Sequence, residues 1–169
     1  MARGFTLLEL VITISVCGVV LAFSAPSFNT MIEGNKMKRL ATEFNGFLIQ
    51  GKSEAVMRNT KLFAHFSFPE GDVYSGLDWT VILADSDDLT TANKIAYFDG
   101  SSYQGISLLH TYSSEQISFD EIRGRPKSGS LSFYPTSDSS IQLSIKTSNP
   151  PGRIRVCSLN GEQYGYQSC

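Results

Sequence analysis

Two arginines near the carboxyl terminus have a spacing that suits phosphate chemistry. They lie in the stretch NPPGRIRVC, residues 149–157, where the residues before Arg153 predict a turn. In a strand that begins after this turn, Arg153 and Arg155 would point to the same face, about 6.5 Å apart. Each guanidinium presents a planar fork of donors that matches phosphate oxygens. The stretch is therefore a candidate anion site, and an ordinary pair of surface arginines is the alternative.

Charge is unevenly distributed along the chain, although the formal net charge is only −2. Residues 60–120 contain two Lys or Arg against nine Asp or Glu, whereas residues 121–169 contain six against three. Arg123, Arg125 and Lys127 in this basic section would extend the arginine pair if folding brought them close. A basic section on an acidic protein predicts either a site for an acidic partner or a solvated face.

A carboxylate lies near the start of the longest apolar run. Residues 5–25, FTLLELVITISVCGVVLAFSA, carry Glu9 as their one charged residue and are long enough to cross ~30 Å of hydrocarbon as a helix. A carboxylate there costs about 2.5–3.5 kcal/mol, so such residues usually have a partner. A Glu that reaches the interface near a helix end is the alternative. Because a cleaved secretory signal would have a shorter apolar region, we expect this segment to be kept as a membrane anchor.

Other residue patterns do not favour an enzyme. The stretch GFLIQGKS, residues 46–53, satisfies the phosphate-binding pattern G-X-X-X-X-G-K-S, but it falls inside a helical period and no α/β alternation follows. Residues 85–88, DSDD, lack the glycine and final glutamate of a calcium loop. His65 and His110 are far apart and no Cys-X-X-Cys is present, which argues against zinc. We therefore expect no catalysis, no metal and no cofactor.

Three cysteines are present. Cys17 lies within the apolar run, where a small apolar side chain is common. In an oxidising compartment such as a periplasm, Cys157 and Cys169 would form the economical disulfide and close a short terminal loop, a stabilisation of roughly 2–3 kcal/mol. Two free thiols are the alternative.

The elements that position these residues are one long helix and a set of strands. The helical period continues beyond Pro26, which predicts a helix over residues 5–59. The apolar stripe of its second half consists of Met37, Leu40, Phe44, Leu48 and Ala55. After Asn59 the period changes to two, in eight short segments rich in β-branched and aromatic residues. We predict an α+β fold, in which the long N-terminal helix packs on an antiparallel β-sheet.

The amino-terminal residues carry a family resemblance. Gly4 followed by Phe5-Thr6-Leu7-Leu8-Glu9 resembles the prepilin signature of type IV pilins and type II secretion pseudopilins. The resemblance implies that a prepilin peptidase cuts between Gly4 and Phe5 and that the new terminus of Phe5 is methylated. It also implies that Glu9 meets the terminal amine of a neighbouring subunit during filament assembly, an attraction that low dielectric strengthens.

Two further stretches are similar to a narrower group. Residues 40–59, LATEFNGFLIQGKSEAVMRN, resemble the helix of H-type minor pseudopilins and FimT/FimU-like minor pilins, although family members commonly carry Ala-Arg where this chain has Gly51 and Lys52. Residues 152–155, GRIR, resemble a carboxyl-terminal G-R-X-R motif associated with DNA binding in FimT-like minor pilins of transformable bacteria. The resemblance implies that Gly152, Arg153 and Arg155 contact DNA, with Arg125 and Lys127 as candidate additions.

Together these features predict a minor type IV pilin that binds extracellular double-stranded DNA weakly and without reading its sequence. The alternative is a minor pseudopilin of type II secretion, or a minor pilin that only initiates assembly. The expected partners are other pilins, the prepilin peptidase, the inner membrane and DNA. We expect the globular domain in the periplasm before assembly and in a pilus or pseudopilus afterwards. The expected division of the chain is a leader at 1–4, a membrane half of the helix at 5–25, an amphipathic half at 26–59 and a β-rich domain at 60–169.

Overall fold

The computed structural model describes residues 4–169, and the side chains of residues 23–27 and 29 lie outside its described part. Residues 1–3 of the predicted leader therefore lie outside the described residues. The side chains at the end of the predicted membrane segment, 23–25, lie outside them as well. The chain divides into two compact units, Met1–Asn35 and Lys36–Cys169. Every strand that the structure describes in residues 4–169 belongs to the second unit.

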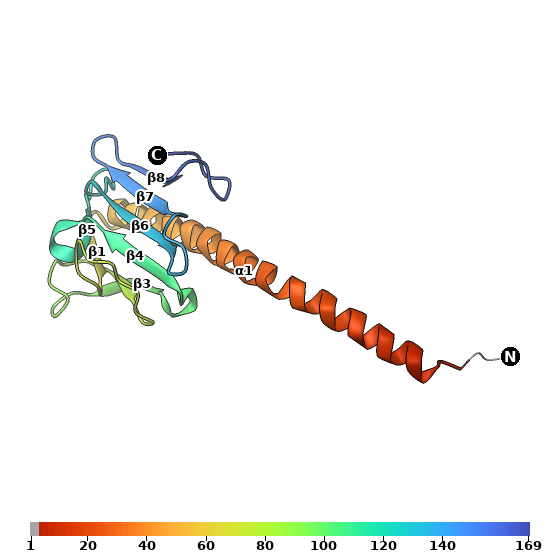
Figure 1. Ribbon diagram of the computed structural model, residues 1–169. Coiled ribbons are helices and arrows are strands. Elements are labelled where there is room, and N and C mark those ends of the chain that lie inside the picture. The colour runs from red at the N-terminus through yellow and green to blue at the C-terminus, as the bar shows by residue number, and fades with distance from the viewer. Residues whose placement is uncertain (1–3) are drawn as a thin grey trace. The chain divides into compact units, whose positions relative to one another are not determined.

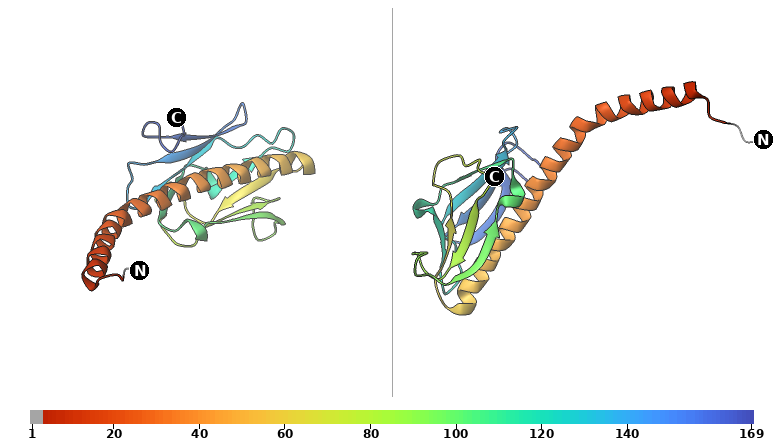
Figure 2. Two further views of the ribbon diagram at one scale, coloured as in Figure 1. Left: turned by 90° about the vertical axis from the view of Figure 1, so that its right-hand side faces the viewer. Right: turned by 90° about the horizontal axis from the view of Figure 1, so that it is seen from below.

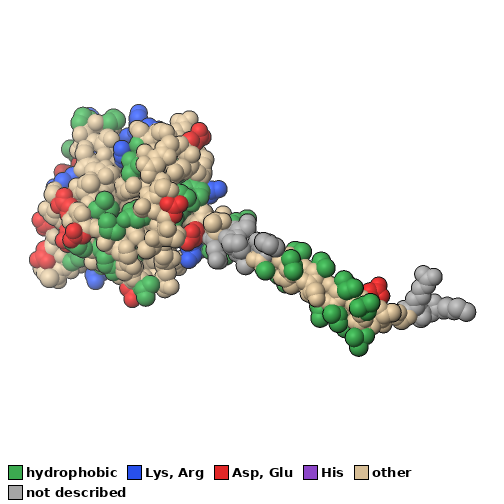
Figure 3. All heavy atoms as spheres, viewed as in Figure 1, with side chains coloured by type: hydrophobic (Ala, Val, Ile, Leu, Met, Phe, Trp, Pro, Cys, Tyr) green, Lys and Arg blue, Asp and Glu red, His purple; other side chains and the backbone are tan. Residues whose placement is uncertain are grey.

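A 52-residue helix, α1 (Leu7–Arg58), occupies the first third of the chain (Figure 1). Thr6 caps its first turn, because its hydroxyl oxygen accepts a hydrogen bond from the backbone N–H of Glu9 at 3.2 Å. Apolar side chains gather on the surface of its amino-terminal part (Figure 3), where Leu7 is 80% exposed and Leu21 is 70% exposed. Within the described residues, no helix combines the length and apolar character needed to cross a membrane. The predicted long helix is confirmed.

In the described part of the chain, eight strands form two antiparallel four-stranded sheets. The first sheet has the order β3-β2-β1-β5, and the second has the order β4-β6-β7-β8. The strands are β1 (Leu62–Phe66), β2 (Thr80–Ala84), β3 (Lys94–Asp99), β4 (Ile106–His110), β5 (Gln116–Phe119), β6 (Gly129–Pro135), β7 (Leu143–Ser148) and β8 (Arg153–Ser158). Two short 3-10 turns, η1 (Ser101–Tyr103) and η2 (Ser113–Glu115), lie between strands.

The α+β class and the antiparallel pairing agree with the sequence, but the prediction of one sheet is incomplete. Each predicted strand segment overlaps one observed strand. The chain changes sheet after β3, returns to the first sheet at β5 and then completes the second. Apolar alternation along a strand indicates which of its faces is buried. It does not determine which strand lies beside it, so the sequence did not predict two sheets.

One core joins the second half of α1 to both sheets. The predicted stripe is confirmed, since Met37, Leu40, Phe44 and Leu48 are all completely buried. The ring of Phe44 lies 5.2 Å from that of Phe98 on β3, and the same cluster includes Leu131 and other residues of the second sheet. Figure 2 shows the strands gathered against this part of α1. Burial of this stripe fixes how the helix meets the domain and, with it, where the loops of the candidate site lie.

Candidate functional site

The arginine pair lies on the exposed face of an edge strand. Arg153 and Arg155 on β8 are exposed, while Ile154 between them is half-buried and packs against the core. In the register between β7 and β8, Lys146 is directly opposite Arg155, and Ser148 is opposite Arg153. Directly opposed residues share a face of the sheet, with Cβ atoms about 4.5–5.5 Å apart. Lys146, which is half-buried, therefore joins the two exposed arginines as a third cation.

The surroundings of these three cations are small and polar. Ser130 on β6 pairs with Lys146. Farther along the same face, Ser144 pairs with both Ser132 and Cys157, and these three residues are buried. The strands β6, β7 and β8 contain no Asp or Glu. Like charges directly opposed across two strands cost stability. An anion bound between Lys146 and Arg155 would offset that cost, which makes this face suited to phosphate.

The turn before Arg153 depends on Gly152. Its φ is +81°, a left-handed value that L residues with a side chain adopt at a cost, and a Cβ added there would lie 2.9 Å from Cγ of Arg125. The backbone N–H of Gly152 donates to Ser148 at 2.7 Å, and its carbonyl accepts from Nζ of Lys52 at 3.2 Å. Lys52 belongs to α1, so the helix holds the start of β8 directly. The fold therefore brings Arg125 next to the turn before Arg153, as an extension of the arginine pair requires.

The second basic loop, residues 120–127, is ordered by Asp120. Its carboxylate accepts hydrogen bonds from the backbone N–H groups of Ile122, Arg123 and Arg125 at 3.0, 2.7 and 2.8 Å. These bonds, first that of Arg123, hold the pKa of Asp120 below its ordinary value. The acidic group therefore stabilises the loop that displays Arg123, which is exposed.

A shallow depression of about 500 Å³ separates this loop from the turn at Asn149. Its lining consists of Lys61, Ser118, Asp120, Arg125, Lys127, Ser128 and Asn149. Two of the predicted cations are less available here than the sequence implied. Arg125 is half-buried, and Lys127 is half-buried with its ammonium donating to the carbonyl and the hydroxyl of Ser113 at 3.2 and 2.6 Å.

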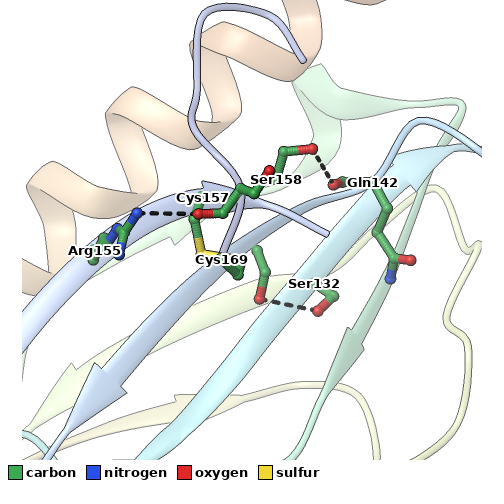
Figure 4. Close-up of a disulfide and its surroundings, with 8 residues drawn as sticks. Ser132, Gln142, Arg155, Cys157, Ser158 and Cys169 are labelled. Atoms are coloured by element: carbon green, nitrogen blue, oxygen red, sulfur yellow. Dashed lines mark hydrogen bonds between the residues drawn. A yellow bond between two sulfur atoms is a disulfide. The ribbon is translucent and has the colours of Figure 1, made fainter. Parts of the chain in front are cut away.

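The carboxyl-terminal cysteines form a disulfide beside Arg155 (Figure 4). Cys157 on β8 is joined to Cys169, with the two Cα atoms 5.0 Å apart. A guanidinium nitrogen of Arg155 donates to the backbone carbonyl of Ser168 at 3.1 Å. Cys17 is an exposed free cysteine.

The remaining sequence patterns have structural explanations. Residues 46–53 lie inside α1, so the resemblance to a phosphate-binding loop is a coincidence of residue types. Asp85 and Asp88 accept hydrogen bonds from Asn93 and Thr90 within the 85–93 turn. The described residues contain no group of three or more His, Cys, Asp or Glu placed to hold a metal.

Both histidines make hydrogen bonds to backbone carbonyls. His65 pairs with Ser86 at 2.9 Å and His110 with Phe68 at 3.0 Å. The ring of His110 also stacks on Phe66, with the centroids 4.4 Å apart. Both side chains are buried and form part of the packed interior of the domain.

The predicted assembly residues lie at the start of the chain. Phe5 is 68% exposed, and nothing lies within 4 Å of a Cβ added at Gly4. Glu9 is exposed in the first turn of α1. Negative charge at this end of a helix is favourable, so the exposed carboxylate costs α1 nothing in water.

Two of the residues around the arginine pair were not singled out from the sequence. Lys146 could have been found by counting outward from the 149–152 turn, since the hairpin places residues 148 and 153 opposite one another. Lys52 had no such signal, because its contact with Gly152 joins residues 100 positions apart. Gly51 beside it lies against the first sheet, where a Cβ would be 3.2 Å from Leu83 and Phe119.

This architecture, a long amino-terminal helix with an antiparallel β-domain, is that of type IV minor pilins and H-type pseudopilins. Residues 40–167 match the family described as type II transport protein GspH, and residues 1–25 match the prokaryotic N-terminal methylation motif. The chain belongs to the GspH family. The fold and family are those of structural pilin proteins.

Two solved structures have a similar fold. Both are crystal structures of the type IV minor pilin FimU of Pseudomonas aeruginosa strain PAO1. The form in space group P21 is 16% identical, covers 79% of this chain and 92% of FimU, and has a TM-score of 0.55. The form in space group P65 is 17% identical, covers 77% and 95%, and has a TM-score of 0.51. No curated protein matches the chain.

Proposed function

We propose that this minor pilin binds double-stranded DNA through the face of β7 and β8 that carries Lys146, Arg153 and Arg155, and that it takes part in DNA uptake during natural transformation. The observation that carries the proposal is the acid-free cluster of Lys146, Arg153 and Arg155. Its cations would contact phosphates along the duplex, so binding would not depend on base sequence and would weaken steeply with salt.

The small number of cations implies weak binding by one subunit. Each phosphate contact contributes about 0.9 to the slope of log affinity against log salt, so three contacts give a slope of about −2.7. Several copies in a filament, or neighbouring pilins with cations of their own, would raise the effective affinity. A filament that presents many weak sites can also release DNA after retraction.

The amino-terminal half would supply anchoring and assembly. In this proposal the peptidase cuts between Gly4 and Phe5, the apolar half of α1 holds the subunit in the inner membrane, and the domain faces the periplasm. Glu9 then pairs with the terminal amine of the preceding subunit when the chain enters the filament, because an unpaired carboxylate is costly in that apolar surrounding. The disulfide supports an oxidising compartment for the domain.

The test is DNA binding by the full chain in detergent micelles, measured by fluorescence anisotropy on a labelled duplex at several salt concentrations. We expect micromolar or weaker affinity, lost in the Arg153→Gln/Arg155→Gln double variant. The matched control is Arg58→Gln/Lys94→Gln, which removes the same charge from exposed positions away from the second sheet. No binding by the wild type, or equal loss in both double variants, would overturn the proposal.

A role in type II secretion is the second candidate, because the description of the matching family is a transport protein of that system. In that case, or for a minor pilin that only initiates assembly, the amino-terminal half would act as proposed and the arginine face would be a solvated surface. Absence of DNA binding would favour this function. Neighbouring genes for secretion rather than for pili and competence would support it independently.

A further inference from the structure

The last residues of the chain return to the strand that carries the arginines. The backbone N–H of Ser158, at the end of β8, donates to Gln167 at 2.9 Å, and the N–H of Cys169 donates to Ser158 at 2.9 Å. The disulfide between Cys157 and Cys169 closes the same loop (Figure 4). Residues 167–169 therefore form a short parallel addition beside Ser158.

This return places a hydrogen-bond acceptor at the arginine site. The carbonyl of Ser168 lies 3.1 Å from a terminal nitrogen of Arg155 (Figure 4). An arginine has five N–H donors in a planar fork, so this bond leaves most donors available for phosphate. For Arg153, the described residues provide no comparable hydrogen bond.

We propose that the disulfide-closed segment 167–169 is a positioning element for Arg155, holding its guanidinium ready for an anionic ligand. This inference rests on the proposed function for the identity of the ligand, the DNA backbone. A long side chain that is free in solution loses rotamer freedom when it binds, and a side chain already held loses less. Arg155 would therefore contribute more to affinity than its charge alone provides.

The rest of the terminal loop is held without the disulfide. Gln163 and Tyr166 exchange two backbone hydrogen bonds, at 3.2 and 2.8 Å, across a tight turn. The side-chain amide of Gln163 donates to Ser140 at 3.2 Å, and the ring of Tyr164 lies 5.9 Å from Nζ of Lys38 on α1. Loss of the disulfide should consequently loosen residues 167–169, which would keep only their two backbone hydrogen bonds to Ser158, and leave the loop up to Tyr166 in place.

The first test combines the two sites in a double-mutant cycle, using the full chain in micelles and a labelled DNA duplex. We expect Cys157→Ser/Cys169→Ser to weaken binding about 2- to 10-fold, the range for ordering one long side chain. The same change should have no effect when Arg155→Gln is already present, and its full effect when Arg153→Gln is present instead. An equal penalty in both backgrounds, or no penalty at all, would overturn the inference.

Because Cys157 is buried, the double serine variant could lose DNA binding by misfolding. A second variant distinguishes misfolding from loss of the positioning contact. A chain that ends at Gln167 keeps Cys157 and removes both the disulfide and the carbonyl of Ser168. It should show the same coupling to Arg155, and thermal unfolding should confirm that it is folded. If it binds DNA like the wild type, Ser168 does not position Arg155.

A third measurement needs neither DNA nor a variant. In NMR spectra of the wild-type chain, we expect separate guanidinium resonances for Arg155, whose rotation the Ser168 carbonyl restrains, and averaged ones for Arg153. Averaged resonances for both would reject the positioning role. Restrained Arg155 resonances together with no DNA binding would keep the positioning role and reject the proposed ligand, so the two failures are distinguishable.

Discussion

At the scale of single residues, the geometry of the candidate site depends on groups that position its backbone. Gly152 sets the direction in which β8 begins, Lys52 holds its carbonyl, and Asp120 organises the neighbouring loop. Each does so through a backbone atom. Substitutions at such positions should change both the stability of the domain and the geometry of the cations.

Replacing Gly152 by Ala tests the first of these residues. A left-handed backbone costs an L residue about 1–2 kcal/mol, and the added Cβ would also displace Arg125. We expect a loss of at least this size in the free energy of unfolding, measured by urea denaturation, together with weaker DNA binding. Gly105 is the matched control, since its φ is +83° but nothing lies within 4 Å of an added Cβ. Equal losses for Gly105→Ala and Gly152→Ala would show that the contact with Arg125 has no role.

Replacing Asp120 by Asn gives a pH-dependent effect with a defined sign. The pKa of Asp120 is lowered, mainly by the N–H of Arg123, so its ionised form is favoured in the folded chain. Its contribution is fully present above the unfolded pKa of about 3.9 and is lost as the pH falls through the lower, folded pKa.

The variant should thus be less stable than the wild type at pH 7, and the difference should shrink as the pH falls below the unfolded value. Denaturation curves of both proteins at pH 7 and in acid would measure this. A difference that stays constant across that range would contradict ionic stabilisation by Asp120.

At the scale of secondary-structure elements, the hairpin of β7 and β8 decides which cations share a face. Lys146 lies opposite Arg155 because the 149–152 turn fixes the register of the two strands. A shift of one residue would turn Lys146 toward the core, where Ile145 and Thr147 now lie. The hairpin is therefore the unit that builds the cation cluster.

Lys146→Gln tests whether this third cation contacts DNA. We expect weaker binding to every duplex sequence, with the slope of log affinity against log salt reduced by about 0.9, the value for one phosphate contact. Lys94→Gln, on β3 of the other sheet, is the control and should leave the slope unchanged. An unchanged slope for Lys146→Gln would limit the site to the two arginines.

The second half of α1 is the other deciding element. It carries both the buried stripe that forms the core and Lys52, which bonds to the turn before β8. The same helix therefore links the amino-terminal residues that we propose for assembly, Phe5 and Glu9, covalently to the residues that support the cation cluster.

At the scale of the whole molecule, the distribution of charge along the chain matters more for the proposed DNA binding than the net charge does. The formal net charge is −2, so the protein as a whole does not attract DNA, and residues 60–120 would repel it. Binding therefore requires that the basic face meet the duplex while the acidic section points away. A filament that presents subunits in one orientation would satisfy this requirement.

Glu9→Ala should separate assembly from binding in the full chain. We expect the variant to be lost from purified filaments, because the terminal amine of its neighbour would have no carboxylate partner in an apolar surrounding. DNA binding by the same variant in micelles should equal that of the wild type. Normal incorporation into filaments would refute the assembly role of Glu9, and weakened DNA binding would show that the two functions are not separable.

The sequence by itself determined the long helix, the buried stripe from Met37 to Ala55, the strand segments and the family, because these depend on local periodicity and on short motifs. It also indicated that Arg153 and Arg155 share a face, since alternation along a strand is a local property. The pairing of Cys157 with Cys169 followed from their closeness in the chain.

The tertiary structure alone decided the division into two sheets, the bond from Lys52 to Gly152, the half-burial of Arg125 and Lys127, and the hydrogen bond between Arg155 and Ser168. These contacts join segments that lie apart in the chain. Their geometry follows from how the whole core packs, and no local pattern of residue types encodes it.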